Sequence, residues 1–484
     1  MLFNSFEYLL YFPLVVGLYF LLPFKWRWLH LLIASYAFYM AWEPAYALLI
    51  FGSTAVDYFV ALRMEKTTEQ TQKRLLLSIS LAVNLGLLFS FKYYNLINGT
   101  FMSVAAMAGF DWPLPESNLL LPVGISFYTF QTLGYSIDVY WGKIKPERHF
   151  GRFALYVCFF PQLVAGPIER AQRLLPQFLL EHRWNSERVA SGLRLIVWGL
   201  FKKVVVADRI AQITDAVYAQ PTSFGGGAVV IATACFGYQV YCDFSGYSDI
   251  AIGSARVMGY DLMTNFDQPH LSRSVDEFWR RWHISLMSWF RDYIFFPLGG
   301  SRVGKLRLYL NVMAVFVASG IWHGAEWSFV VWGAMNGLYI IVGMYTADFR
   351  DRWAERTGWA KYTRTRAVWQ VVSAVSITYF SFGFFRADNM GHALSVYTRL
   401  LYDWQSVLDP SSFFTFADAL GMEAVMVAFC LALLPLTELM EYAQRHKAEW
   451  EVPTWAQWAS DYALFFSVLA LGRFSSDAFF YFQF

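Results

Sequence analysis

LYLNVMAVFVASGIWHGAEWSFVVWGAMNGLYIIVGMY, residues 308–345, decides the fold. Glu326 is the only formally charged residue in this run, and so apolar a stretch is typical of membrane-spanning segments. The run is too long for one straight span, because a helix rises about 1.5 Å per residue and the hydrocarbon core is about 30 Å thick. We therefore predict a break at WHGAE (322–326).

His323 lies at this predicted break. An ionisable side chain is costly to keep at membrane depth, and such residues usually serve a function. The alternative is a packed histidine that bonds a neighbouring carbonyl group. A simple hairpin at 320–326 would place His323 at the membrane surface, whereas a broken or re-entrant helix would place it near the midplane.

The composition indicates an integral membrane protein whose apolar surface contacts membrane lipid. Hydrophobic residues make up 57% of the 484 residues, aromatic residues 20% and charged residues 15%. Soluble domains carry about 25% charged residues, and Trp and Tyr favour the two membrane interfaces. The net charge of +2 gives no indication of nucleic-acid binding. The apolar N-terminus lacks a basic start and a small-residue cleavage site, so we expect a retained first span rather than a signal peptide.

Apolar stretches along the chain predict an all-α polytopic membrane protein. We expect about eleven to thirteen membrane elements, some of them short, re-entrant or interfacial, because spans need about 20 apolar residues. The candidate segments are 5–24, 28–42, 45–62, 75–91, 119–141, 152–166, 189–210, 226–242, 245–260, 308–322, 327–346, 367–385, 422–440 and 460–474. Pro and Gly recur inside apolar stretches, as in LPVGISFYTF (121–130), and the broken helices that they predict imply an internal cavity. An enzyme and a transporter would both satisfy that expectation.

Basic residues mark every second connection between these segments. Lys25, the segment 63–74 and the segment 143–152 are basic, whereas the connections near Glu43 and over 95–118 contain no Lys or Arg. By the positive-inside rule, the basic connections are cytoplasmic and the N-terminus lies outside, in the periplasm of a Gram-negative cell. The basic segment 350–366 is assigned to the cytoplasm as well.

SVDEFWRRWHISLMSWFRDY (274–293) predicts a single amphipathic helix at a membrane interface. Ser274 and Glu277 form a capping box at its start. One helical stripe is aromatic and aliphatic, and the opposite side carries Arg280, Arg281 and Arg291. His283 falls on the shoulder between the two faces, where an interfacial histidine touching water is the plain alternative to a functional one.

Two further polar stretches flank that helix. DFSGYSD (243–249) contains Asp243 and Asp249, which could orient a catalytic histidine or, equally, cap a helix. PLGGSRVGKLR (297–307) carries Arg302, Lys305 and Arg307 beside glycines, as either a phosphate-binding segment or a basic cytoplasmic turn. It lacks the spacing of a P-loop, and no GxSxG elbow is present.

Cysteine and histidine spacing gives no indication of a metal site. Cys158, Cys235, Cys242 and Cys430 form no CxxC pair, and no HExxH pattern occurs. We expect these cysteines to be buried small residues, without a disulfide framework or a bound metal.

The two histidine stretches RRWHISLMSWFRDYIFFPLGGSR (280–302) and SGIWHGAEWSFVVWGAMNG (319–337) resemble the membrane-bound O-acyltransferase family. LPVGISFYTFQTLGYSIDVYWG (121–142), FFPQLVAGPIER (159–170) and YCDFSGYSDIAIG (241–253) are similar to its bacterial alginate O-acetyltransferase-like branch. The resemblance spans nearly all of 1–484, is weakest over 346–470, and implies one membrane domain around a funnel or tunnel, with the core motifs over 119–340.

The resemblance implies the site residues. His323 corresponds to the family histidine, acting as base or nucleophile, and His283 to a second polar position near donor or acceptor. The implied donor is acetyl-CoA from the cytoplasm, with Arg302, Lys305 and Arg307 as candidate phosphate contacts. Asp243, Asp249, Arg280 and Arg281 are supporting polar candidates.

The C-terminal tail over 475–484 resembles an acyl carrier. Its ending FFYFQF (479–484) is similar to the motif of a short membrane peptide that accompanies D-alanyl transferases, where a tyrosine can carry the acyl group. We therefore hypothesise that Tyr481 carries acetyl. The alternative is an aromatic interface anchor.

The sequence thus favours an O-acetyltransferase that moves acetyl across the inner membrane to an extracytoplasmic polysaccharide such as alginate. The resemblance also implies a periplasmic SGNH/hydrolase-like acetyltransferase as partner. Three alternatives stay open: peptidoglycan, cellulose or another glycan as acceptor, D-alanyl transfer to teichoic acid, and a transporter without enzymatic activity.

Overall fold

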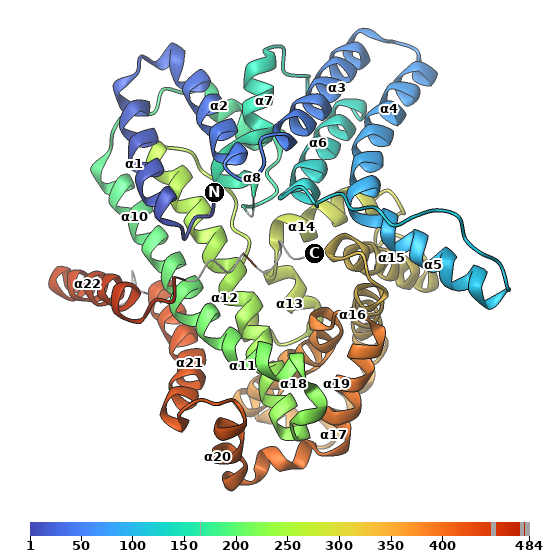
Figure 1. The fold of residues 1–484 in the computed structure, drawn as a ribbon, viewed down its shortest axis with the longest axis vertical. Helices are drawn as coiled ribbons and strands as arrows, with labels where there is room; N and C mark the ends of the chain where they lie inside the picture. The colour runs from blue at the N-terminus through green and yellow to red at the C-terminus, as the bar shows by residue number, and fades with distance from the viewer. Residues whose placement is uncertain (165, 447–451, 475–478, 480–484) are drawn as a thin grey trace. The chain divides into compact units, whose positions relative to one another are not determined.

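The computed structural model describes residues 1–164, 166–446, 452–474 and 479, which form helices and, within these ranges, no β-strand (Figure 1). The α-helices are α1 (Phe6–Leu21), α2 (Phe24–Met40), α3 (Tyr46–Lys66), α4 (Gln70–Leu88), α5 (Tyr94–Met107), α6 (Ile125–Tyr140), α7 (Phe150–Cys158), α8 (Phe160–Leu163), α9 (Ala171–Leu174), α10 (Ser186–Leu200), α11 (Asp208–Ala219), α12 (Gly226–Met258), α13 (Val275–Arg281), α14 (Ile284–Phe290), α15 (Lys305–His323), α16 (Trp327–Tyr345), α17 (Ala347–Arg356), α18 (Thr363–Arg386), α19 (Met390–Tyr402), α20 (Pro410–Ala419), α21 (Ala424–His446) and α22 (Thr454–Leu471). The π-helical turns are η1 (Phe89–Tyr93), η3 (Phe201–Ala207) and η6 (Arg291–Phe295), and the 3-10 turns are η2 (Leu175–Leu179), η4 (Pro221–Ser223), η5 (Pro269–Leu271), η7 (Trp359–Lys361) and η8 (Trp404–Leu408).

The chain is an all-α polytopic membrane protein. Within the described ranges, seven helical segments are long and apolar enough to span a membrane. They are Tyr46–Lys66, Gln70–Met107, Gly226–Met258, Lys305–His323, Trp327–Tyr345, Thr363–Arg386 and Ala424–His446. The expected pair of spans 226–242 and 245–260 is wrong, because α12 runs unbroken through 33 residues. The expected span 152–166 is also wrong, because α7 ends at Cys158 and only the short α8 follows it.

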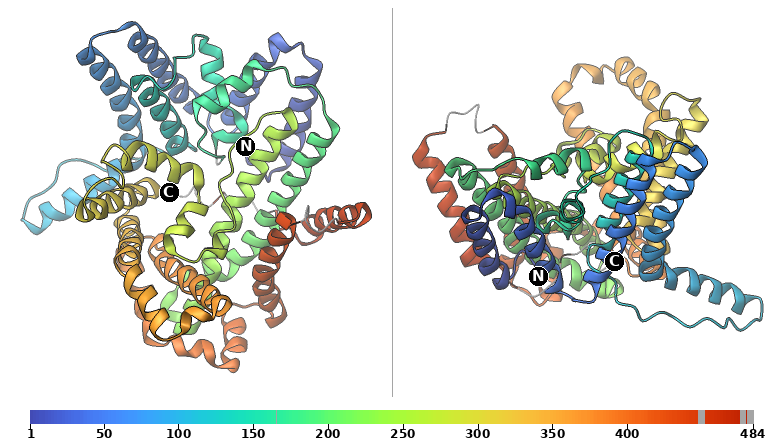
Figure 2. Two further views of the ribbon diagram at one scale, coloured as in Figure 1. Left: turned by 180° about the vertical axis from the view of Figure 1, so that it is seen from behind. Right: turned by 90° about the horizontal axis from the view of Figure 1, so that it is seen from above.

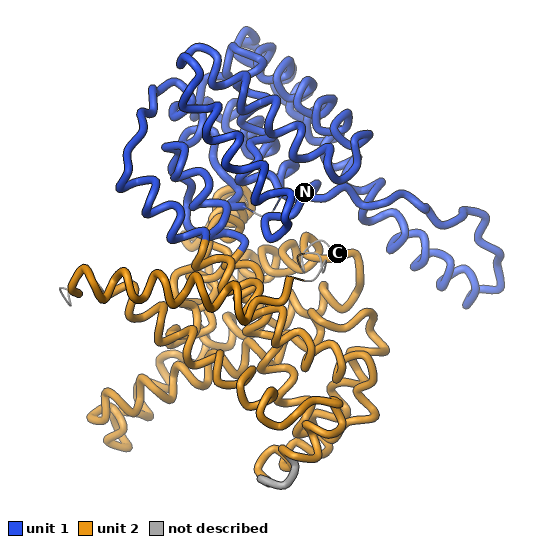
Figure 3. Tube along the Cα trace, turned by 60° about the vertical axis from the view of Figure 1, so that its left-hand side comes forward, with its two compact units in different colours: residues 1–196, 247–264, 481–484 blue, residues 197–246, 265–480 orange. Residues whose placement is uncertain are grey.

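The chain divides into two compact units, coloured separately in Figure 3. Unit 1 comprises residues 1–196, 247–264 and 481–484, and unit 2 comprises residues 197–246 and 265–480. The single domain and the funnel implied by the resemblance stay predictions.

In unit 1, α3, α4 and α6 pack together (Figures 1 and 2). A carboxylate is buried between them. Asp57 of α3 is fully buried, and it accepts hydrogen bonds from Ser80 Oγ at 2.5 Å, Asn84 Nδ2 at 2.9 and 3.1 Å, and Ser136 Oγ at 3.3 Å. Burying a carboxylate in an apolar bundle requires such donors, since an unbonded buried charge is strongly unfavourable. The cluster therefore fixes the packing of these three helices.

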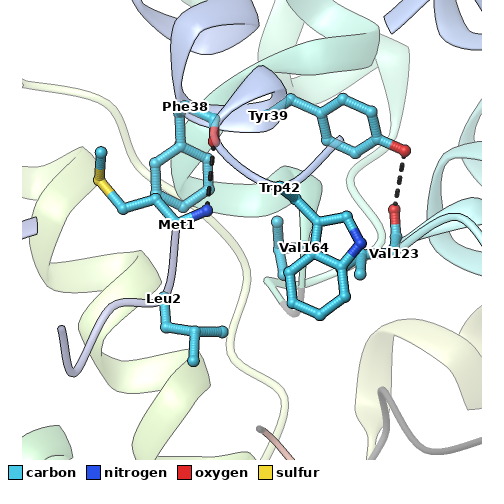
Figure 4. Close-up of a pocket in the computed structure, with 7 residues that line it drawn as sticks. All are labelled: Met1, Leu2, Phe38, Tyr39, Trp42, Val123 and Val164. Carbon is cyan, nitrogen blue, oxygen red and sulfur yellow. Dashed lines mark hydrogen bonds between the residues drawn. The ribbon is translucent and has the colours of Figure 1, made fainter. Parts of the chain in front are cut away.

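Unit 1 also contains a small, mainly apolar pocket near the N-terminus (Figure 4). Its walls are Met1, Leu2, Phe38, Tyr39, Trp42, Val123 and Val164. The Met1 ammonium group donates to the Phe38 carbonyl at 3.4 Å, and Tyr39 Oη donates to the Val123 carbonyl at 3.1 Å. No histidine, cysteine or carboxylate is among these lining residues.

In unit 2, α15 and α16 form a tight hairpin that confirms the predicted break. α15 ends at His323, Gly324 is extended, and α16 begins at Trp327 after Glu326. A Cβ atom at Gly320 would lie 2.3 Å from the Phe329 carbonyl oxygen, and one at Gly333 would lie 2.3 Å from that of Phe316. The two glycines therefore let the helix backbones approach closely, as small residues do between membrane helices.

Candidate active site

His323 lies at the end of α15, where its ring is enclosed by aromatic side chains. It is 4% exposed. Its ring centroid lies 4.8 Å from that of Trp322, 5.0 Å from Trp332 and 5.2 Å from Phe385. The expectation that His323 is buried beside the predicted break is thus confirmed.

His283 lies at a second helix break, between α13 and α14. One of the two bonds of the predicted capping box is present at the start of α13: the Glu277 amide donates to Ser274 Oγ at 3.1 Å. The single amphipathic helix over 274–293 is wrong: α13 ends at Arg281, and His283 adopts a left-handed conformation with φ 46°. A non-glycine residue rarely adopts this conformation without compensating interactions.

Asn265 supplies interactions that hold the break in place. Its carbonyl oxygen accepts from the Ile284 amide at 2.9 Å, and its Oδ1 accepts from Ser285 Oγ at 2.6 Å. These bonds replace the helical pattern at the start of α14. The placement of His283 on the shoulder of an interfacial helix is therefore wrong, because its side chain is turned inward and only 1% exposed.

The two histidines lie close together within unit 2. Their ring centroids are 6.5 Å apart, and Trp322 contacts both rings, at 5.7 Å from His283. Phe244 of α12 covers the other side of His283 at 4.6 Å. Because burial disfavours the charged imidazolium, the pKa of His283 is lowered to about 3, so this imidazole is neutral near pH 7. Neutral imidazoles in an apolar setting can accept a proton or attack an acyl carbon.

Asp243 and Asp249 both lie inside α12, so their alternative role as helix caps is wrong. Asp243 is buried and forms an ion pair with Lys203 Nζ at 2.7 Å, and the same Nζ lies 2.8 Å from Asp208. Asp249 is half-buried and belongs to unit 1. The structure thus places Asp243 in a buried ion-pair cluster and gives no support for Asp249 beside the histidines.

Of the arginine and lysine candidates, Arg281 is half-buried and the others are exposed. Arg280 pairs with Asp276, and Arg281 with Glu277 at 2.6 Å, each one turn apart on α13. Arg302, Lys305 and Arg307 are exposed around the start of α15. Exposed basic groups at a helix entry can contact an anionic ligand, but their position alone identifies none.

Tyr481 lies outside the described residues. Phe479, two residues earlier in the sequence, is fully buried, and its ring lies 5.6 Å from that of Phe244. Phe244 also contacts His283. The start of the FFYFQF ending therefore approaches the residues that surround the histidine pair.

A second buried histidine site was missed by the sequence reasoning. His270 of η5 bonds Glu438 of α21 through Nδ1, and its Nε2 lies 2.6 Å from Tyr379 Oη of α18. The ion pairs of Lys203 with Asp208 and Asp243 were missed as well. A signal was available for the lysine, because FKKVVVADR (201–209) places two lysines inside an expected span and a buried lysine needs a carboxylate. No local signal links His270 to residue 438, which is far away in the sequence.

The fold and site define a helical membrane protein that buries two histidines at neighbouring helix breaks, among aromatic rings. A family model for the membrane-bound O-acyltransferase (MBOAT) family matches residues 147–382, a range that includes both histidines. The chain is 40% identical to the probable alginate O-acetylase AlgI of Azotobacter vinelandii, over 71% of this chain and 68% of the relative.

Two other relatives extend the comparison. The peptidoglycan O-acetyltransferase of Helicobacter pylori is 34% identical, with 76% of this chain and 72% of that protein covered. The teichoic acid D-alanyltransferase of Bacillus subtilis is 29% identical, with 56% and 69% covered. This chain belongs to the membrane-bound O-acyltransferase family, and it is a membrane-embedded acyltransferase.

Proposed function

We propose that the chain takes acetyl from acetyl-CoA at the cytoplasmic side of the inner membrane and passes it outward for O-acetylation of an extracytoplasmic polysaccharide. The observation that carries the proposal is the buried histidine pair, His323 and His283, with ring centroids 6.5 Å apart. Acyl transfer to a hydroxyl group needs a proton acceptor at the acyl carbon, and a buried neutral imidazole is suited to that role.

In this proposal His323 acts as base or nucleophile, and His283 is the second polar group. As a base, His323 removes the proton of the acceptor hydroxyl while its oxygen attacks the thioester carbonyl. As a nucleophile, it forms the acyl bond itself and then passes the acyl group on. His283 stays neutral in its apolar surroundings, so it can donate one hydrogen bond to donor or acceptor without adding charge.

The proposed donor enters from the cytoplasm, beside the start of α15. Arg302, Lys305 and Arg307 are exposed there, and basic groups attract the phosphates of CoA. The cytoplasmic assignment, like the periplasmic N-terminus, rests on the alternation of basic connections.

Alginate is the proposed acceptor polymer, with a periplasmic SGNH/hydrolase-like acetyltransferase completing the transfer. The 40% identity to a probable alginate O-acetylase supports this choice. Peptidoglycan is the second candidate, because a peptidoglycan O-acetyltransferase is 34% identical over 76% of the chain. Purified oligomannuronate and peptidoglycan fragments, supplied in parallel to membranes that contain the partner, would separate the two.

Tyr481 is the proposed intermediate carrier of acetyl. The burial of Phe479 against Phe244 supports the idea, since it brings the start of the same ending toward the His283 surroundings. Replacement Tyr481→Phe removes only the phenol oxygen. Full acetyl export by this variant would contradict the carrier role and leave Tyr481 as an aromatic anchor.

The test uses purified protein in nanodiscs with acetyl-labelled CoA, and it follows free CoA and protein-bound label. Wild type should release CoA, and His323→Ala should lose that release. His392→Ala, at the start of α19, is the matched control and should retain it. Release that persists in His323→Ala would remove His323 from the chemistry, and a carrier without acyltransferase activity would release none in any variant.

A further inference from the structure

Trp332 of α16 lies directly beside His323. The indole is 1% exposed, and its plane is nearly perpendicular to the imidazole, at 85° with 5.0 Å between ring centroids. Its other ring neighbours include Trp279, Phe382 and Phe385, at 5.5, 6.4 and 4.9 Å. The indole thus forms one wall of the space around His323, and its only polar atom is the N–H group.

That N–H group is buried without a hydrogen-bond partner among the described residues. Buried donors are nearly always bonded, and an unbonded one destabilises the fold. The neighbouring Trp279 shows the usual arrangement, because its Nε1 donates to Asn336 Oδ1 at 3.2 Å. Of two contacting indoles, one therefore has an acceptor within the protein, and the one beside His323 does not.

Ser328 provides a second donor of the same kind. It is fully buried, and its hydroxyl has no hydrogen-bond partner among the described residues. Because it precedes Trp332 by four residues on α16, the two side chains share one face of the helix. That face is the one that turns Trp332 toward His323.

The hairpin holds this face rigidly against α15. Gly320 of α15 and Gly333 of α16 leave no room for a Cβ atom, so the two helix backbones are in close contact there. Donors fixed before the reaction need no reorganisation when charge develops, and this is why preorganised donors stabilise a transition state. Two unbonded donors on a closely packed helix beside a base are what an oxyanion site requires.

We propose that Trp332 Nε1–H, with Ser328 Oγ–H beside it, binds the carbonyl oxygen of the acyl group during transfer. The inference rests on the proposed acetyl-CoA reaction at His323. The acceptor oxygen loses its proton to His323 and forms a C–O bond to the carbonyl carbon, and the C=O pair moves onto the oxygen that the two donors hold. When that pair returns, the C–S bond breaks and the departing CoA sulfur takes the proton from His323.

The test replaces the N–H group alone. In the Trp332→3-benzothienylalanine variant, sulfur stands in place of the indole N–H and the ring keeps its shape. We expect kcat for CoA release to fall about 100-fold, as on loss of one oxyanion donor, with KM changed less than threefold. The Tm should stay equal or rise, because the variant removes an unbonded buried donor. Ser328→Ala should lower kcat by a smaller factor.

The same replacement at Trp279 is the matched control. It leaves Asn336 Oδ1 without its indole donor, so we expect Tm to fall while kcat stays within threefold of wild type. A Trp332 variant that keeps its kcat overturns the inference, whatever its Tm. A fall in Tm without loss of kcat would mean that the indole N–H only binds a buried water. If wild type releases no CoA, the proposed function fails and the inference falls with it. Release that is lost in His323→Ala but kept in both α16 variants overturns the inference alone.

Discussion

His270 and His323 are both buried in unit 2, yet their surroundings differ in kind. His270 lies between a carboxylate and a phenol, with Glu438 at one ring nitrogen and Tyr379 Oη 2.6 Å from the other. His323 is packed by the rings of Trp322, Trp332 and Phe385. A histidine fixed at both nitrogens is suited to holding helices together, whereas one among aromatic rings can exchange a proton with a substrate. The comparison separates buried polar groups that are bonded within the fold from the buried histidine that we propose takes part in acyl transfer.

The largest expected effect on the free energy of unfolding is at Lys203, which, like His270, is bonded to carboxylates within the fold. Lys203→Met leaves the buried Asp243 and Asp208 without the ammonium group that lies 2.7 and 2.8 Å from them. Removing one partner of a buried ion pair costs about 4 kcal/mol of unfolding free energy. Unfolding in detergent, with the exposed Lys66→Met as control, measures it. An unchanged stability would show that the cluster contributes nothing to the fold.

A smaller loss is expected from Glu438→Ala, which removes the carboxylate partner of His270. Loss of one charge-assisted hydrogen bond costs about 2 kcal/mol. The rate of CoA release per folded molecule should stay near that of wild type, since the proposed reaction assigns this histidine no role. Glu423→Ala, at the exposed start of α21, is the control. If the rate falls while the free energy of unfolding is retained, His270 takes part in acyl transfer.

The smallest expected effect is the contribution of His283 to the pH dependence of the free energy of unfolding. Because burial lowers the pKa of His283 to about 3 in the fold, the unfolded chain binds a proton at higher pH than the folded chain does. Stability contributed by the neutral ring is fully present above the unfolded pKa of about 6.5, and about 1.4 kcal/mol of it is lost by pH 5.5. His283→Gln should reduce this pH dependence in unfolding curves. Identical slopes for both proteins between pH 5 and 7 would contradict the neutral assignment.

The sequence predicted the break between α15 and α16 because its signals are local. The run 308–345 is too long for one span, and WHGAE marks the break that the structure shows between His323 and Trp327. The burial of His323 followed from the apolar run around it. The four cysteines are also buried, as expected.

The errors arose where distant residues decide the local structure. The helix predicted over 274–293 breaks at His283 because Asn265 bonds the amide of Ile284 and the hydroxyl of Ser285. The polar stretch 243–249 did not end a span, because Lys203 neutralises Asp243 inside α12. Helical periodicity contains no information on such partners. The same limit hid the contact of His270 with Glu438.

The most direct test of the central claim compares two substitutions of the same type, His323→Gln and His270→Gln, in nanodiscs with labelled acetyl-CoA. The account predicts that His323→Gln loses CoA release by about 10³-fold or more, within the range of general base catalysis, while its Tm stays near that of wild type. His270→Gln should keep its rate per folded molecule and lose several degrees of Tm. The reverse pattern, with release retained in His323→Gln and lost in stably folded His270→Gln, would contradict the account.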